Sequence, residues 1–407
     1  MRVVVLTSSY PRFKGDGTAP FVLSISEEMA RLGHDIEVVA PYDPQVKAAG
    51  TGSIKVHRFR YIWPEQLHIM GHARALREDV KLNPIAFVLL PFFLIAAFFK
   101  LMSVTQEQKS QIIHVHWVLP NGFIAAIVAG LRKIPFVISL HGSDIYVAKR
   151  YRLFGYVAKW IFHRATAVTA CSPELNENAI TLGASNGISL IPWGADPTVF
   201  RPTFNKSTIR QKFGWEDNDF IVVALGRMVP KKGFKTLIDL LPKIADRIPK
   251  FRLAIGGDGP LRNTLRRQAE ELRVTGYVSF PGSIPWGLVP DFLAAADIFV
   301  LPSVRDKHGN VDGLPTVLLE AMGCGIAVIA SDIGGVRLVV NDNHNGLLVP
   351  AGDVEAITNA IICLAEDPRK REILGEAARK SIEEQFNWRS IAERIISILE
   401  QAIKERM

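Results

Sequence analysis

Cysteine is scarce in this chain, which has three in 407 residues. Cys171, Cys324 and Cys363 are far apart in the sequence, so they form neither a disulfide framework nor the spacing of a zinc site. The first residues lack the long apolar core and the small-residue cleavage site of a secretion signal. We therefore expect a protein that works in a reducing compartment, the cytoplasm.

Low-complexity segments and internal repeats are also absent from the sequence. Hydrophobic residues make up 48% of the chain and charged residues 22%, which is an ordinary globular composition. This composition excludes a mainly disordered, collagen-like or coiled-coil protein. At roughly 100–200 residues per domain, the length indicates two or three domains.

Long apolar runs are limited to Ile85–Phe99, fifteen residues without a charge and with Pro91 in the middle. As a helix this run would be about 22 Å long, shorter than the roughly 30 Å hydrocarbon core of a bilayer. The length favours a buried core helix or an interfacial segment over a transmembrane span.

The net charge of +8 is unevenly distributed. Residues 1–195 hold 20 Lys and Arg against 13 Asp and Glu, whereas residues 196–407 hold 28 against 27. The excess in the first half indicates an anionic partner, either a membrane surface or a nucleic acid. No helix-turn-helix or ribonucleoprotein motif is visible, so we expect no nucleic-acid partner.

Residues 146–164 interleave basic and aromatic side chains. On a single helix, Lys149, Arg152, Tyr156 and Lys159 would share one face. This pattern is typical of a helix on anionic lipid, but a solvated basic face over an ordinary core has the same pattern.

Strand-like and helical segments alternate along the chain, which predicts an α/β protein with parallel sheets. The alternation is interrupted at Trp193–Pro202 and then starts again. We expect domains at residues 1–195 and 196–385 and a C-terminal helical segment at 386–407. In such sheets ligands bind at the carboxyl ends of strands, so the loops there are the candidate sites.

Three features of the first half lie in or beside such loops. Gly17 belongs to a glycine-containing loop after the first strand, where backbone can approach a ligand closely or simply form a turn. His141 follows a strand, with Asp144 placed to cap the next helix or to orient the histidine. His114 and His116 alternate on one strand, but no third ligand is spaced to complete a metal site.

In the second half, Gly226–Gly233 combines a strand end, a guanidinium (Arg227) and an ammonium (Lys232) before a helix. This combination suits a diphosphate, or it is a solvated basic turn. The spacing is not that of a Walker A loop. Gly256–Pro260 is interpreted as a tight turn.

The segment Asp312–Gly325 carries two carboxylates eight residues apart. Asp312 precedes a predicted helix, and Glu320 lies within it among apolar neighbours, where an unpartnered carboxylate is costly. Two such acids, with helix N-terminal N–H groups between them, suit a sugar and a ribose joined by a diphosphate.

Taken in order, these motifs resemble those of the family-4 retaining glycosyltransferases (glycosyltransferase group 1), which use nucleotide sugars and have the GT-B fold. The matching segments are Gly15–Thr18, Gly33–Pro41, His114–Trp117, His141–Asp144, Gly226–Gly233, Gly256–Pro260, Phe280–Pro285, Asp312–Gly325 and Ser331–Asp353. The resemblance implies two Rossmann-like domains with parallel sheets facing across a cleft, and a C-terminal helix that returns to the N-terminal domain.

The resemblance also implies residue roles. Arg227 and Lys232 would hold the donor diphosphate, Glu320 the ribose, and Asp312 the hydroxyls of the transferred sugar, which His141 would face. The further donor-binding positions that it implies are Gly17, Ile284, Gly313, Leu314, Pro315, Thr316 and Val317. Asp312 replaces the family's usual glutamate, and the N-terminal loop has Gly-Asp-Gly instead of a glycine pair.

We therefore expect transfer of a sugar from a nucleotide diphospho-sugar, with retention at the anomeric carbon and with no metal or other cofactor. The basic first half favours a lipid-linked or membrane-associated glycan as acceptor, at the cytoplasmic face of the membrane. The alternatives are a soluble disaccharide or polysaccharide synthase, a nucleotide-sugar epimerase of the same fold, and a non-catalytic nucleotide-sugar-binding protein.

Overall fold

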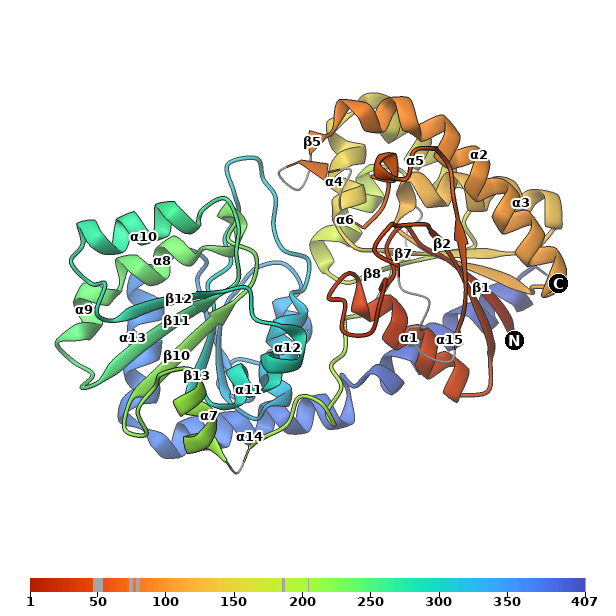
Figure 1. Ribbon diagram of the computed structural model, residues 1–407. Helices are drawn as coiled ribbons and strands as arrows, with labels where there is room; N and C mark the ends of the chain where they lie inside the picture. The colour runs from red at the N-terminus through yellow and green to blue at the C-terminus, as the bar shows by residue number, and fades with distance from the viewer. Residues whose placement is uncertain (47–53, 73–75, 78–80, 185–186, 204, 407) are drawn as a thin grey trace. The chain divides into compact units, whose positions relative to one another are not determined.

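The computed structural model describes residues 1–46, 54–72, 76–77, 81–184, 187–203 and 205–406 (Figure 1). The chain divides into two compact units, one formed by Met1–Ile191 with Trp388–Met407 and the other by Pro192–Asn387. Each unit is one parallel sheet with helices on both faces, a Rossmann-like arrangement. The predicted fold class is confirmed.

Unit 1 contains a seven-stranded sheet in the order β3-β2-β1-β6-β7-β8-β9, in which every neighbouring pair is parallel. The strands are β1 (Arg2–Leu6), β2 (Asp35–Pro41), β3 (Lys55–Phe59), β6 (Ile112–His116), β7 (Phe136–Leu140), β8 (Ala167–Ala170) and β9 (Ser189–Leu190). A two-stranded antiparallel ribbon, β4 (Leu76–Arg77) and β5 (Lys81–Leu82), is separate. The helices are α1 (Pro20–Arg31), α2 (Pro84–Glu107), α3 (Phe123–Arg132), α4 (Ser143–Arg150), α5 (Arg152–Phe162), α6 (Pro173–Thr181) and α15 (Trp388–Lys404).

The order of the strands reverses direction between β1 and β6. The chain runs outward from β1 to β3 on one side and from β6 to β9 on the other. The loops after β1 and β6 therefore diverge, and a crevice at this switch point is the usual ligand site of an open parallel sheet. Both central strands are almost fully buried, which explains their continuous apolar sequences.

Helix α15 belongs to unit 1, although 196 residues of unit 2 separate it from the rest. It packs on α1, β6 and β7, and its buried side chains recur with helical spacing. Helices α2 and α3 pack on one another and contact β1, β2, β3, β6 and β7. Figure 1 shows these two pairs of helices on opposite faces of the sheet.

The apolar run in the first half is part of a longer helix than the sequence suggested. Helix α2 has 24 residues, which corresponds to about 36 Å, so the length argument against a span does not hold. By length and composition it is a helix that could cross a membrane. One face is buried against the sheet, for example at Leu89, Phe93 and Ala97. The other face is exposed.

The interpretation of residues 146–164 as one basic-aromatic helix is wrong. Helix α4 ends at Arg150, Tyr151 is extended, and α5 starts at Arg152. Lys149 therefore lies on a different helix from Arg152, and it donates a hydrogen bond to Asn178 Oδ1 at 2.6 Å.

Unit 2 contains a six-stranded parallel sheet in the order β12-β11-β10-β13-β14-β15. The strands are β10 (Phe220–Leu225), β11 (Phe251–Gly256), β12 (Val278–Gly282), β13 (Ile298–Leu301), β14 (Ala327–Ser331) and β15 (Leu347–Val349). The helices are α7 (Lys206–Lys212), α8 (Phe234–Asp239), α9 (Leu241–Ala245), α10 (Arg262–Glu271), α11 (Val289–Ala294), α12 (Thr316–Gly323), α13 (Val354–Glu366) and α14 (Pro368–Glu384).

Alternate side chains of the unit 2 strands form its core. Val222 and Ala224 of β10 pack in one cluster with Leu237 of α8, Leu265 of α10 and Ile361 of α13. Figure 1 places α11, α12 and α14 on the other face of this sheet. The switch point of unit 2 is between β10 and β13, because the chain runs outward from each of them.

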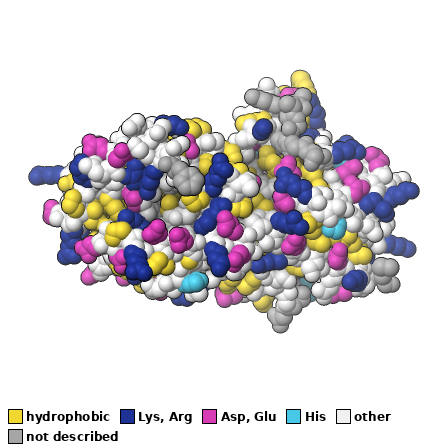
Figure 2. Space-filling model, turned by 90° about the horizontal axis from the view of Figure 1, so that it is seen from below, with side chains coloured by type: hydrophobic (Ala, Val, Ile, Leu, Met, Phe, Trp, Pro, Cys, Tyr) yellow, Lys and Arg dark blue, Asp and Glu magenta, His cyan; other side chains and the backbone are white. Residues whose placement is uncertain are grey.

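The face drawn in Figure 2 has Lys and Arg side chains interleaved with Asp and Glu side chains. Elsewhere on the described surface, ion pairs four residues apart also occur on helices, such as Arg379 with Glu383 on α14 and Arg389 with Glu393 on α15. Mixed charge of this kind is typical of a solvated surface.

Candidate active site

The switch point of unit 2 brings together basic and acidic residues from two loops. Lys231 and Lys232 lie in the short 3₁₀ helix η3 (Pro230–Lys232), which follows β10, and Asp312 lies in the loop after β13. Lys232 Nζ is 2.8 Å from Asp312 Oδ2, and Lys231 Nζ is 3.3 Å from Asp312 Oδ1. Burial acts to raise the pKa of Asp312, but the two ammonium groups outweigh it and hold the pKa below its ordinary value.

Glu320 is the second acid of this site and is buried in α12. Burial raises its pKa to about 7, although the Thr316 hydroxyl and the Lys232 ammonium both act to lower it. The ammonium of Lys232 thus acts electrostatically on both predicted acids. A buried carboxyl group whose pKa is raised, with a lysine acting on it at the carboxyl ends of the sheet strands, is typical of a ligand-binding site.

Two glycines hold the loops of this site close together. Gly233, just before α8, has φ +67°, and a Cβ there would lie 1.8 Å from the carbonyl oxygen of Pro302, after β13. Gly257, after β11, has φ +118°, and a Cβ there would lie 1.9 Å from Gly226 O. The tight turn predicted for Gly256–Pro260 is thus packed against the loop that carries Arg227 and Lys232.

The other predicted donor-binding residues of unit 2 are placed as follows. Arg227 is exposed directly after β10, and Gly313 follows Asp312 in its loop. Ile284 is half-buried after β12, with Cγ1 beside the Gly256 turn. Leu314 and Pro315 precede α12, while Thr316 and Val317 form its first turn. All of these residues lie in loops or helix starts at the carboxyl ends of the sheet strands.

The predicted histidine lies at the corresponding edge of unit 1. His141 follows β7, and its Nε2 is 2.8 Å from His116 Nδ1, with the two rings stacked. His114 Nε2 is 2.8 Å from Ser139 Oγ. Burial lowers the pKa of His114 to about 4 and takes those of His116 and His141 well below their ordinary value. The three imidazoles are therefore neutral at physiological pH.

Asp144 does not orient His141 as one reading of the sequence allowed. Its carboxylate accepts hydrogen bonds from the backbone N–H of Val118 at 2.6 Å and of Gly142 at 3.2 Å. Burial raises the pKa of Asp144 to about 6 against these hydrogen bonds. Within the described residues no group of three or more His, Cys, Asp or Glu side chains is arranged to hold a metal ion.

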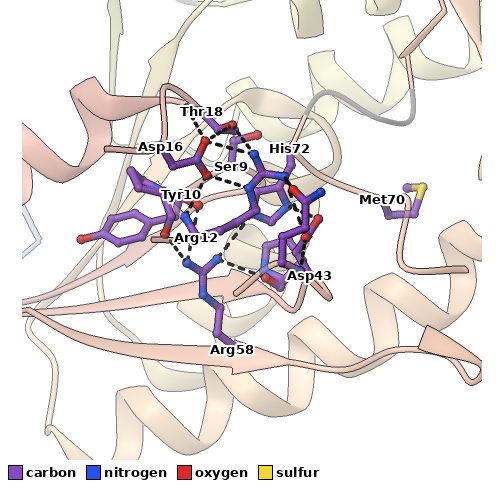
Figure 3. Close-up of polar contacts among 12 residues, drawn as sticks. Ser9, Tyr10, Arg12, Asp16, Thr18, Asp43, Arg58, Met70 and His72 are labelled. Carbon is purple, nitrogen blue, oxygen red and sulfur yellow. Dashed lines mark hydrogen bonds and ion pairs between the residues drawn. The ribbon is translucent and has the colours of Figure 1, made fainter. Parts of the chain in front are cut away.

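The loop that carries Gly17 contains a network that the sequence analysis missed. In Figure 3 the Arg12 guanidinium lies between two carboxylates, at 2.6 Å from Asp16 Oδ2 and 3.9 Å from Asp43 Oδ1. Asp16 also accepts hydrogen bonds from the backbone N–H and hydroxyl of Thr18. Burial acts to raise the pKa of Asp16, but its hydrogen bonds hold that pKa far below the ordinary range.

These contacts explain the Gly-Asp-Gly sequence of the loop, because the central aspartate is the anchor of its conformation. Gly17 itself is exposed beside that anchor. The spacing of Arg12 and Asp16 was a local signal for an ion pair. The contribution of Asp43, from the segment after β2, had no such signal.

Comparison with known proteins decides the family. The family described as "Glycosyl transferases group 1" matches residues 205–381, and the "Glycosyl transferase 4-like domain" matches residues 16–194. The GDP-mannose-dependent alpha-(1-6)-phosphatidylinositol monomannoside mannosyltransferase of Mycolicibacterium smegmatis is 37% identical over 274 residues, which cover 67% of this chain and 71% of that protein. The chain belongs to the group 1 glycosyltransferase family.

Other relatives of this glycosyltransferase cover nearly its whole length. The putative teichuronic acid biosynthesis glycosyltransferase TuaC of Bacillus subtilis is 29% identical over 395 residues, 95% of each chain. Among solved structures, sucrose-phosphate synthase from Thermosynechococcus elongatus has a TM-score of 0.76 at 23% identity and covers 99% of each chain. Anabaena HepE in complex with UDP has a TM-score of 0.75 at 22% identity and covers 98% of this chain and 100% of that one. These structures support the GT-B fold.

Proposed function

We propose that this glycosyltransferase transfers a hexose from a nucleotide diphospho-sugar to a lipid-linked or membrane-associated glycan, with retention at the anomeric carbon. The observation that carries the proposal is the pair of ammonium groups held on Asp312 beside the buried Glu320, at the switch point of unit 2. This arrangement combines charge for a diphosphate with carboxylates for hydroxyl groups.

In the proposed reaction the bond between the anomeric carbon and the diphosphate oxygen breaks, and a bond from the acceptor oxygen forms on the same face of the sugar. The acceptor proton passes to the departing phosphate oxygen. Arg227 and Lys232 would neutralise the charge that develops on the diphosphate, so that no metal is required. Asp312 would contact sugar hydroxyls, Glu320 the ribose, and His141 the transferred sugar.

The site supports only a class of donor, and the relatives suggest the first compound to test. The Mycolicibacterium smegmatis relative is named as GDP-mannose-dependent, and the Anabaena neighbour was solved with UDP. We propose GDP-mannose as the first donor because the sequence identity to the GDP-mannose-dependent protein is the higher of the two.

The membrane acceptor is supported by the outer face of unit 1. Ile85, Val88, Phe92, Ile95 and Phe99 are exposed on α2 and recur every three or four residues, so they form one stripe. Exposed Arg150 and Arg152 flank Tyr151, whose ring lies 6.2 Å from that of Phe87 on α2. An apolar stripe next to cationic side chains fits an anionic membrane surface. We place the protein at the cytoplasmic face of such a membrane.

A thermal-shift titration tests the donor site. We expect one of GDP-mannose, UDP-glucose and ADP-glucose to raise the melting temperature in buffer that contains EDTA. The Lys232→Ala and Arg227→Ala variants should lose most of this shift, and Lys232→Ala should lower turnover by about 10²–10³-fold.

Lys235→Ala is the matched control, since Lys235 is an exposed lysine on α8 whose ammonium pairs with Asp239. It should retain the full shift and the full turnover. If no donor produced a shift, or if the shift were unchanged in Lys232→Ala, the proposed donor site would be contradicted. A non-catalytic protein would then be the favoured alternative.

A further inference from the structure

Unit 1 contains an apolar pocket of about 380 Å³ at its switch point. Its walls come from α2, α4, α5, the short helical segment η2 (Val118–Gly122), Phe123 of α3, Met70 and Gly71 before β4, and the loop after β1. Of the described residues that line it, only Ser8, Ser9 and Asp144 carry hydroxyl or carboxyl groups. The pocket is therefore almost entirely a hydrocarbon surface.

This lining does not suit a sugar or a nucleotide. Sites for polar ligands present several convergent hydrogen-bonding groups. The one carboxylate here, Asp144, is buried and already accepts hydrogen bonds from two backbone N–H groups, those of Val118 and Gly142. Binding an apolar chain would remove both the pocket wall and the chain from water.

The pocket is open at the surface beside the exposed stripe of α2. Leu153 and Phe87 belong to its wall and are nevertheless 70% and 46% exposed. The Phe87 and Phe154 rings stack with centroids 6.1 Å apart, which joins α2 to α5 at this edge. Arg150 and Arg152 are exposed in the same segment. An apolar mouth next to cationic side chains matches the chemistry of a lipid in an anionic bilayer.

One wall of the pocket contacts the histidine that the family resemblance assigned to the transferred sugar. Trp117 lines the pocket, and its ring contacts the His141 ring with centroids 4.5 Å apart. Trp117 has φ +68°, a conformation that non-glycine residues adopt rarely and that clusters at functional sites. One indole thus separates the hydrocarbon surface from His141.

We propose that this pocket binds the hydrocarbon chain of the lipid-linked acceptor and thereby holds the acceptor's polar end at the carboxyl ends of β1 and β6. The inference rests on the proposed function, since it names the acceptor class of the same site. Chain binding in the pocket, rather than head-group binding alone, then sets which lipids are used.

The test measures chain binding without donor or glycosyl transfer. The probe is 11-(dansylamino)undecanoic acid, whose fluorescence reports its transfer from water to an apolar site. Hexanoate, octanoate and decanoate, all monomeric, are then used to displace it from the full-length protein. Because the carboxylate is common to the series, we expect affinity to rise about threefold to fourfold for each added methylene group.

Two pocket variants and one matched control locate the binding. Val157→Trp and Leu90→Trp place an indole in the pocket wall and should weaken probe binding at least tenfold. Leu131→Trp makes the second of these substitutions on α3, at a residue that is 62% exposed and outside both the pocket lining and the stripe. It should change probe affinity by less than twofold.

The donor titration separates failure of this inference from failure of the proposed function. If calorimetry gives both pocket variants the unit 1 melting transition of the wild type, unit 1 is folded in each and its probe affinity is informative. Probe binding that is independent of chain length, or equal in wild type and both folded pocket variants, would overturn the inference. The inference would also be overturned if sedimentation showed a dimer that cannot bind the probe because its interface covers the pocket. Loss of the donor shift in wild type would instead contradict the proposed function alone.

Discussion

At the scale of single residues, the pKa values of two carboxyl groups eight positions apart are shifted in opposite directions. Asp312 is kept ionised by the ammonium groups of Lys231 and Lys232, which overcome the effect of burial on its pKa. Glu320 lies in an apolar helix where burial dominates, so its pKa is about 7. The apolar neighbours of Glu320 predicted its burial from the sequence, whereas the contact of Lys231 with Asp312 needed the structure.

The raised pKa of Glu320 makes stability depend on pH. Between its ordinary value of 4.5 and about 7, the folded protein binds this proton more tightly than the unfolded chain does. The free energy of unfolding therefore falls as the pH rises through this window. Glu320→Gln removes the group, so we expect the variant to gain up to about 3 kcal/mol relative to wild type between pH 5 and pH 8.

Urea unfolding of both proteins at the two pH values measures this difference. Glu372→Gln, at an exposed position of α14, is the control and should show the same difference from wild type at both pH values. A pH-independent effect of Glu320→Gln would show that the carboxyl group is solvated. The same variant should bind the nucleotide donor more weakly if Glu320 contacts the ribose.

At the scale of secondary-structure elements, α2 is the least expected feature. The sequence predicted a short apolar helix at Ile85–Phe99, but good helix-forming residues beyond Phe99 extend it to Glu107. Pro91 is accommodated within the helix. Its apolar sequence has little amphipathic signal, so only packing on the sheet separates the buried face from the exposed one.

If the exposed face of α2 contacts lipid, an acidic residue in its stripe should weaken membrane binding. We expect Val88→Asp to lower partitioning onto vesicles rich in phosphatidylglycerol by about tenfold or more, because it removes an apolar contact and adds a charge that the lipid repels. Sedimentation of the protein with vesicles at low salt measures the partitioning.

Leu131→Asp provides the comparison, since Leu131 is an exposed apolar residue on α3, outside the stripe. Its partitioning should stay within about twofold of wild type. Equal partitioning of wild type and Val88→Asp would contradict a membrane role for the stripe, and absence of binding in wild type would remove the membrane surface from the proposed function.

At the scale of the whole molecule, the chain completes unit 1 only with its last helix. Helix α15 buries Ile391, Ile395 and Leu399, and it packs on α1. All the predicted donor-binding residues except Gly17 belong to unit 2. Removal of α15 should therefore affect the two units differently.

We expect a chain that ends at Asn387 to unfold unit 1 at a lower temperature, because α1 and the interior strands β6 and β7 lose the apolar cover of α15. The donor-dependent thermal shift of unit 2 should persist. Differential scanning calorimetry with and without GDP-mannose resolves the two transitions. A chain that ends at Lys404 retains the whole helix and should melt like wild type, whereas an unchanged unit 1 transition in the shorter chain would contradict the role of α15.

Much of this architecture was predictable from the sequence because the signals are local. Buried parallel strands read as continuous apolar runs, and loops such as Gly226–Gly233 and Asp312–Gly325 follow them at fixed places. These signals gave the α/β class, two parallel-sheet domains, the family, and the loops that carry the candidate donor site. These signals depend only on neighbours within a few residues, so they can be recognised without knowledge of the fold.

Tertiary structure decided the features that join distant segments. It brought the ammonium groups of Lys231 and Lys232 to one carboxylate and the guanidinium of Arg12 close to Asp43. It also ended the expected basic helix at Tyr151 and formed an apolar pocket from segments far apart in the sequence. No sequence pattern encodes these contacts, because each depends on which strands are neighbours and where the order of the sheet reverses. The chemistry of the loops is therefore local in origin, whereas the sites that they form are a property of the folded sheet.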